Sequence, residues 1–263
     1  AYGLLFYQIL KPWKGNMITL GFDYKTYGGK AWNRFLNGKP DKVMVDTSSY
    51  DLGGYAIFQQ NLFKNHFTIN GGGRLEHNKS YGNKWIPQAG IAIRPTDNAV
   101  IKSSFSKGFR NPTIREMFMW APANPDLKPE EMTNYEVVLE HRFFHQHVDI
   151  EVSGFFAEGK NLIQTQMVDD RPKNVNAGNF RNKGIEAAVS MDITKYLRLS
   201  GNYSYLYMQK PVLNSPERQL YVNANIHTRK WNIDVGYRNI NGLYLVTGKA
   251  PVQEDYDLLN ARI

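Results

Sequence analysis

Five side chains in two long polar segments of this chain could bind an anion. The segments run over Gly108–Glu131 and Gly159–Phe180. The five residues are Arg110, Arg115, Trp120, Arg171 and Lys173. Guanidinium and ammonium groups form charge-assisted hydrogen bonds with anions, and an indole ring adds stacking area. We therefore predict that these side chains bind the ligand of the protein.

Three histidines, His141, His145 and His147, could suggest a metal site because imidazole is a common zinc ligand. They straddle a short turn, however, and we favour a solvated turn with no metal. The run Gly71–Gly73 lies in a strand-like segment, where it permits bending or close approach rather than phosphate binding. No Ser-His-Asp arrangement stands out. We predict neither a catalytic site nor a cofactor, and hence no enzyme.

Segments of about ten residues with alternating apolar and polar side chains recur along the chain. Clear examples are Lys183–Asp192, Tyr196–Gln209 and Trp231–Ile240. A period of two residues predicts β-strands, and we expect about 13 of them. No stretch approaches the roughly 20 apolar residues of a membrane-spanning helix.

The connections between these strands fall into a short class and a long class that alternate. The short ones lie near Lys11–Gly15, Phe63–Asn65, Pro95–Asn98, Phe143–Gln146, Ile193–Lys195 and Thr228–Lys230. The long ones lie near Tyr27–Ser49, Gly108–Glu131, Gly159–Phe180, Gln209–Glu217 and Asn241–Glu254, with a shorter one at Asn78–Asn83. Transmembrane barrels have this asymmetry, with short periplasmic turns and longer extracellular loops, whereas nothing in a soluble sandwich enforces it. The fold class predicted is therefore all-β: a transmembrane antiparallel up-and-down β-barrel.

Charge and strand count add two expectations. The formal net charge of +8 indicates contact with acidic lipid headgroups rather than nucleic acid, because no basic stretch is interleaved with a nucleic-acid reader motif. An odd number of strands leaves an open edge, which cannot sit in lipid. Residues 1–263 are thus expected to be part of a single barrel domain that is incomplete in this chain. One strand face is predicted to carry mixed charges into the barrel interior: Arg74, Glu76, Lys102, Glu136, Glu140, Asp149, Glu151, Glu186, Arg198, Asp234 and Arg238.

The most distinctive segment joins Ser106–Glu116 to Ala123–Glu130. Here Arg110 closes a strand, Asn111 is expected to cap a short helical turn from Ile114 to Trp120, and Pro112 fits the first helical position. The alternative to ligand binding is that these residues only order a long loop over the barrel mouth.

These segments, together with Asn176–Glu186, resemble the TonB-dependent outer-membrane receptors, in the style of Bacteroidetes sequences. The resemblance implies a barrel of about 22 strands with an N-terminal plug domain, of which this chain would supply about strands 8 to 20. The plug, the first strands and the last two would lie outside residues 1–263. The resemblance also implies a place in the cell outer membrane, with lipid and lipopolysaccharide, the protein's own plug and the inner-membrane TonB complex as partners.

The resemblance implies active import of a scarce extracellular nutrient. We favour an iron chelate such as a ferric siderophore. Some heme receptors of the family carry Phe-Arg-Ala-Pro and Asn-Pro-Asn-Leu motifs around a ligand histidine. This chain has Phe109–Pro112 and Asn124–Leu127 with no histidine between them, which puts heme uptake in doubt. The alternative function is a passive porin-type diffusion channel, and cobalamin, metal or glycan ligands remain open.

Overall fold

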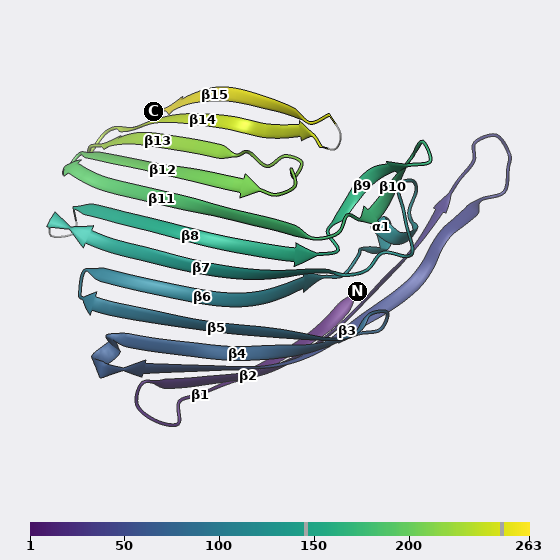
Figure 1. Cartoon of the computed structure of the whole chain (residues 1–263), viewed down its shortest axis with the longest axis horizontal. Helices are drawn as coiled ribbons and strands as arrows, with labels where there is room; N and C mark the ends of the chain where they lie inside the picture. The colour runs from purple at the N-terminus through teal and green to yellow at the C-terminus, as the bar shows by residue number, and fades with distance from the viewer. Residues whose placement is uncertain (145–146, 248–249) are drawn as a thin grey trace.

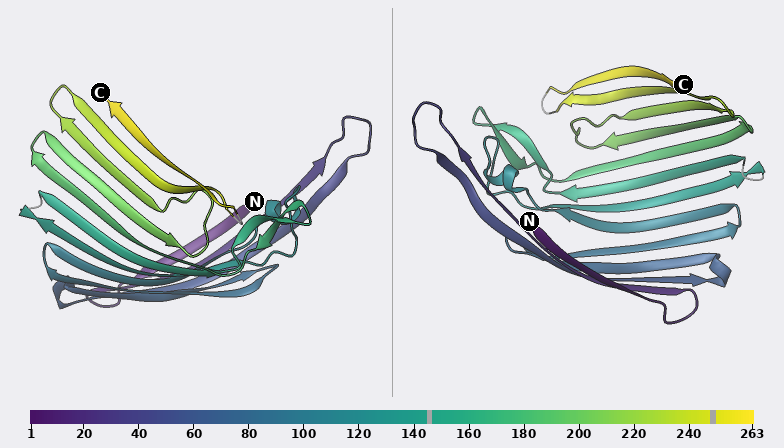
Figure 2. Two further views of the ribbon diagram at one scale, coloured as in Figure 1. Left: turned by 45° about the horizontal axis from the view of Figure 1, so that its top comes forward. Right: turned by 180° about the vertical axis from the view of Figure 1, so that it is seen from behind.

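The fold is one antiparallel sheet that curves into an open trough (Figures 1 and 2). It comes from a computed structural model that describes residues 1–144, 147–247 and 250–263. Each strand of the sheet pairs with its neighbour in sequence, except that β11 follows β8. The 13 sheet strands are β1 (Tyr2–Leu10), β2 (Asn16–Asn33), β3 (Lys42–Leu62), β4 (Phe67–Asn78), β5 (Gly82–Thr96), β6 (Ala99–Arg110), β7 (Glu130–Phe143), β8 (Val148–Lys160), β11 (Phe180–Thr194), β12 (Leu197–Met208), β13 (Arg218–His227), β14 (Asn232–Val246) and β15 (Val252–Arg262).

The expected strand number and the antiparallel up-and-down order are confirmed. The sheet does not close into a full barrel: β1 and β15 are its two edge strands and do not pair with each other. The remaining elements are the one-turn helix η1 (Phe63–Asn65), the helix α1 (Ile114–Phe118) and the separate hairpin of β9 (Ile163–Val168) and β10 (Arg171–Asn176). Among the described residues, no helix is long and apolar enough to cross a membrane.

The strand register gives the sheet one apolar and one polar face. Tyr135 of β7, for example, lies opposite Phe105 of β6 and Phe156 of β8. The charged residues predicted for the interior share the other face, where Lys102 and Glu140 form an ion pair. Apolar side chains remain open to the outside, with Leu75 53% and Ile185 55% exposed. Such a face is the one that lipid covers in a membrane barrel.

Two predicted long loops are mostly strand. Tyr27–Ser49 forms the outer part of the β2–β3 hairpin, with Tyr27 opposite Ser49 and Trp32 opposite Val43, so only residues 34–41 connect the strands. Asn241–Glu254 is likewise largely paired strand. Both faces of a hairpin that projects into water are solvated, so alternation weakens there and the sequence resembles a loop.

The strict alternation of long and short connections is also wrong at Asn78–Asn83. Only residues 79–81 connect β4 to β5, a span as short as the turns at the opposite end. The Asn78 side chain closes this turn by accepting hydrogen bonds from the backbone N–H groups of Ser80 (2.8 Å) and Tyr81 (3.0 Å). An Asx turn of this kind reverses the chain in few residues.

The N-terminal cap of α1 is Thr113 rather than the predicted Asn111. The Thr113 hydroxyl accepts a hydrogen bond from the Glu116 backbone N–H (3.1 Å), and the Glu116 carboxylate accepts one from the Thr113 N–H (2.8 Å). This reciprocal capping box satisfies two backbone donors, which an asparagine two residues earlier could not do. The helix ends at Phe118, before Trp120.

Candidate functional site

Two long connections at one end of the sheet are joined to each other. We call residues 111–129 the α1 loop and residues 161–179 the β9–β10 loop; both lie at the same end as the tip of the β2–β3 hairpin (Figure 1). Asn174 is 7% exposed, and its Nδ2 donates to the Glu116 carbonyl (3.2 Å). Its backbone N–H donates to the Pro122 carbonyl (2.6 Å), and its carbonyl accepts from Asn124 Nδ2 (2.7 Å). Buried amides paired in this way fix one loop against the other.

A second group of hydrogen bonds joins the same loops nearer the sheet. Asn176 accepts from the Lys128 N–H (2.9 Å) and donates to the Lys128 carbonyl (2.9 Å). Glu130, at the start of β7, accepts from the Ile163 N–H (2.7 Å). Leu127, next to Lys128 in the same loop, is buried at 3% exposed. Asn124 and Leu127 of the Asn-Pro-Asp-Leu segment thus help to order the loops.

Arg110 links the sheet to α1. Its guanidinium forms ion pairs with Glu130 (2.6 Å) and Glu116 (2.9 Å). Burial alone would raise the pKa of Glu116, but hydrogen bonds from Arg110 and Thr113 outweigh it and hold that pKa below its ordinary value. Arg110 is therefore already bonded within the protein, and its geometry suits a positioning role for α1.

A hollow of about 760 Å³ lies where the start of the α1 loop passes over the polar face of the sheet. We call it the α1 hollow. Its wall comes from β2 to β6 and its cover from residues 111–115. Lys25 and Tyr27 belong to the wall and Arg115 to the cover. The acidic groups of the wall are engaged, because Glu76 pairs with Arg74 (2.8 Å) and Asp51 accepts from Asn78 (2.6 Å).

The two basic side chains of the hollow, Lys25 and Arg115, have no such partners in the part of the chain that the structure describes. Within the described residues, neither has a carboxylate at ion-pair distance, and the Lys25 ammonium lies over the Tyr27 ring at 5.3 Å from its centroid. The Asn111 Oδ1 atom also borders the hollow and has no hydrogen-bond partner in the described part of the protein. An ammonium, a guanidinium and an aromatic ring around one hollow can hold an anionic group against a flat apolar one.

The five predicted ligand residues are only partly brought together. Arg110 and Arg115 both lie at the start of α1: Arg110 pairs with Glu116, and Arg115 borders the α1 hollow. Trp120 is 49% exposed and its Nε1 donates to Asn33 at the end of β2 (2.9 Å). Arg171 and Lys173 are exposed on β10 and alternate with Asn174, so they project from the other side of that hairpin.

Sequence reasoning missed Lys25, Tyr27 and the asparagines that join the loops. Lys25 and Tyr27 stand two residues apart on the strand face that also carries Asp23. This spacing was the sequence signal that could have placed both side chains on the interior face. No local pattern reveals that Asn124 bonds a carbonyl 50 residues later in the chain.

His141 and His147 lie at the opposite end of the sheet, where β7 leads to β8. The His141 ring stacks on Phe143 with centroids 3.9 Å apart, and His145 lies outside the described residues. No group of three histidine, aspartate or glutamate side chains in the described part of the chain could hold a metal ion.

A curved antiparallel sheet with one apolar and one polar face, and with joined loops at one end, defines part of a membrane-spanning β-barrel. Residues 3–263 match the model of the family described as TonB dependent receptor-like, beta-barrel. The chain belongs to this family of outer-membrane receptors, and the predicted location and the absence of an enzymatic role are thereby confirmed.

Curated relatives include a vitamin B12 transporter and an iron-regulated outer membrane protein. The chain is 25% identical over 224 residues to the vitamin B12 transporter BtuB of Photobacterium profundum, covering 79% of this chain and 35% of that protein. It is 26% identical over 192 residues to the iron-regulated outer membrane virulence protein of Vibrio cholerae, covering 62% of this chain and 29% of that protein. The chain thus spans about a third of the length of these relatives.

Solved structures share the fold at low sequence identity. The ferric enterobactin receptor PfeA of Pseudomonas aeruginosa superimposes with a TM-score of 0.77 at 16% identity, covering 98% of this chain and 45% of that one. The copper transporter OprC gives a TM-score of 0.78 at 12% identity, covering 98% of this chain and 46% of that one.

Proposed function

We propose that this chain is the main part of the barrel of an active outer-membrane receptor that imports a scarce nutrient, namely an iron chelate such as a ferric siderophore. The observation that carries the proposal is the α1 hollow, which opens at the long-loop end and is bordered by Lys25, Tyr27 and Arg115. Relatives named for vitamin B12 transport and iron regulation support nutrient import as its purpose. An N-terminal plug and energy from the inner-membrane TonB complex belong to this proposal.

The five predicted ligand residues take different roles in it. Arg115 meets the anionic part of the ligand, and Trp120 offers its exposed ring at the edge of the mouth. Arg110 positions α1 through its two carboxylate partners. Arg171 and Lys173, exposed on β10, attract an anion to the outer rim.

The test is a binding titration of the full-length receptor with ferric siderophores, heme and cobalamin. We expect an anionic ferric siderophore to bind, and Arg115→Ala and Lys25→Ala each to weaken it about tenfold, as loss of a charge-assisted hydrogen bond does. The paired variant Arg171→Ala/Lys173→Ala is the matched control and should change affinity less while slowing association.

Two results would overturn the proposal. If Arg115→Ala and Lys25→Ala bind every ligand as the parent does, the α1 hollow is not the binding site. If solute enters cells at the same rate after the inner-membrane proton gradient is collapsed, the protein is a passive channel. Cobalamin is the second candidate ligand, because 25% identity over 224 residues connects the chain to a vitamin B12 transporter.

A further inference from the structure

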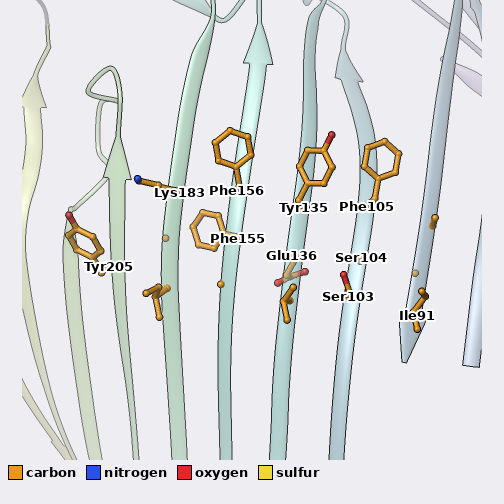
Figure 3. A pocket seen from close by; sticks show the side chains of 16 residues that line it. Ile91, Ser103, Ser104, Phe105, Tyr135, Glu136, Phe155, Phe156, Lys183 and Tyr205 are labelled. Carbon is orange, nitrogen blue, oxygen red and sulfur yellow. The ribbon is translucent and has the colours of Figure 1, made fainter. Parts of the chain in front are cut away.

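Side chains of neighbouring strands contact each other on both faces of the sheet. On the outward face the contacts are apolar, as between Phe105 of β6 and Tyr135 of β7, whose ring centroids are 5.3 Å apart (Figure 3). On the inward face they are polar, and β4 carries three side chains that make them: Arg74, Glu76 and Asn78. Because side chains two residues apart in a strand share a face, all three lie on the side of the sheet to which the α1 hollow belongs.

Arg74 reaches across β3 to a carboxylate of β2. Its guanidinium forms two parallel hydrogen bonds with Asp23, one of them from Nη2 to Oδ1 (2.8 Å), and it also pairs with Glu76 (2.8 Å). Asp23 and Glu76 both lie opposite Gly53 of β3, one on each side of it. A Cβ atom added at Gly53 would overlap the Arg74 guanidinium. The missing side chain at Gly53 is therefore the space through which Arg74 crosses β3.

Asn78 holds the third carboxylate of this wall. It is 2% exposed, and its Nδ2 donates to Asp51 of β3 (2.6 Å) and to the Tyr27 hydroxyl of β2 (3.2 Å). Its Oδ1 is occupied by the backbone of the turn that follows β4. Asp51 is thus bonded to β4, although Lys25 lies directly opposite it on β2.

Lys25 is the side chain whose surroundings these contacts determine. Residues directly opposite each other in an antiparallel pair have Cβ atoms about 4.5–5.5 Å apart, so Lys25 could otherwise pair with Asp51. Asp23 lies two residues away on the same face, at about 7 Å, and is also within reach of a lysine side chain. Both carboxylates are engaged by β4, and the ammonium of Lys25 lies over the Tyr27 ring instead.

We propose that Arg74 makes the α1 hollow selective for an anionic ligand by holding Asp23 and Glu76 away from Lys25. Arg74 is a positioning residue, because it contacts the carboxylates of the wall and leaves Lys25 to meet the ligand. Without the Arg74 charge, one carboxylate would attract the Lys25 ammonium and the other would repel an anion. The proposal rests on the function proposed above, in which Lys25 borders the ligand site.

Binding of a ferric tris-catecholate, a trianion, to the full-length receptor tests the selectivity. Arg74→Gln and Gly53→Ala should each weaken binding about tenfold, the first by removing the guanidinium and the second by displacing it. Gly54→Ala is the matched control, because a Cβ atom there meets nothing within 4 Å and points to the outward face. Its affinity should equal that of the parent. Equal unfolding midpoints identify the variants that are correctly folded.

A rescue variant separates the charge of Arg74 from a merely structural role. Asp23→Asn/Arg74→Gln/Glu76→Gln removes both carboxylates together with their partner, so nothing new attracts Lys25 and nothing new repels the ligand. This variant should recover most of the affinity that Arg74→Gln loses. A structural role of the ion pairs predicts the opposite, because the triple variant has none of them.

Acylation of Lys25 by an amine-reactive reagent, followed by peptide mass spectrometry, tests the same contacts in the absence of any ligand. An ammonium that pairs with a carboxylate loses its proton less readily and therefore reacts more slowly. Lys25 should react more slowly in Arg74→Gln and in Gly53→Ala than in the parent, and at the parent rate in Gly54→Ala.

Two results would overturn the proposal. The first is acylation of Lys25 at the parent rate in both Arg74→Gln and Gly53→Ala. The second is catecholate binding that Lys25→Ala weakens but Arg74→Gln and Gly53→Ala do not; in that case the function proposed above still stands. If Lys25→Ala binds the catecholate as the parent does, that function fails instead, and the acylation rates alone decide whether Arg74 keeps Lys25 from its neighbouring carboxylates.

Discussion

Asn174→Ala should loosen the contact between the β9–β10 loop and the α1 loop, although the backbone hydrogen bonds of residue 174 to Pro122 and Asn124 remain. The Asn174 side chain makes two hydrogen bonds, from its Nδ2 to the Glu116 carbonyl (3.2 Å) and from the Thr165 hydroxyl to its Oδ1 (2.9 Å). Thr165 is exposed and can turn to water, whereas the Glu116 carbonyl loses a partner in a partly buried place. Only the bond to Glu116 joins the two loops, because Thr165 belongs to the same hairpin as Asn174, and its loss amounts to about 0.5–1.5 kcal/mol of local stability. That energy corresponds to roughly 2- to 13-fold more frequent opening.

Amide hydrogen exchange measures this opening directly. The reporter is the Asn124 N–H, which donates to the Glu116 carbonyl (2.9 Å) across the turn that follows α1. Its exchange should accelerate by the stated factor, while amides in the middle of the sheet keep the parent rate. Gln166→Ala is the control, because Gln166 is exposed on the same hairpin and faces away from the α1 loop. Equal exchange in Asn174→Ala and Gln166→Ala would refute the reasoning that these side-chain bonds hold the loops together.

Two other variants test local features of the sheet and the helix. The lowered pKa of Glu116 means that its carboxylate stabilises the start of α1 above the ordinary glutamate pKa, and this stabilisation is lost as the pH falls through the folded-state value. The protection factors of α1 amides, which correct for the intrinsic pH dependence of exchange, should therefore fall in acid for the parent but not for Glu116→Gln. A Cβ at Gly72 would lie 2.3 Å from the Ala56 carbonyl oxygen, so Gly72→Ala should cost about 1–3 kcal/mol in denaturant unfolding. Gly71→Ala, whose Cβ meets nothing closer than 3.8 Å, should leave the unfolding midpoint unchanged.

The wall of the barrel was predictable because lipid imposes a simple rule on it. Strands that face lipid on one side and the barrel interior on the other must alternate, and the outward-facing residues Ile185, Ala187, Val189 and Met191 follow this rule. The rule ends where the membrane ends. Tyr27–Ser49 is solvated on both faces, so its pairing depends on backbone hydrogen bonds that leave little trace in side-chain type.

For the long-loop end, the sequence predicted which segments lie there but not the role of each residue. Arg110 was assigned to ligand binding by its residue type, yet it is bonded to Glu116, six residues later, and to Glu130, where the chain returns 20 residues later. The same holds for Asn174, whose partner Glu116 lies 58 residues earlier. A loop residue's chemistry is visible in the sequence, but whether that chemistry is directed inward or outward is decided by tertiary contacts.

The joined loops also bear on how tightly the α1 hollow could bind. A flexible loop must be ordered when a ligand arrives, and each immobilised side chain then costs about 0.5–1.5 kcal/mol of binding energy. Here the capping box, the ion pairs of Arg110 and the amide bonds of Asn174 have already ordered the cover of the hollow. The backbone of Arg115, carried by α1, is thereby presented without the cost of ordering the loop, and only the Arg115 side chain remains to be immobilised. Residues that never touch the ligand should therefore affect its affinity, and Asn174→Ala should weaken binding even though Arg115 itself is unchanged.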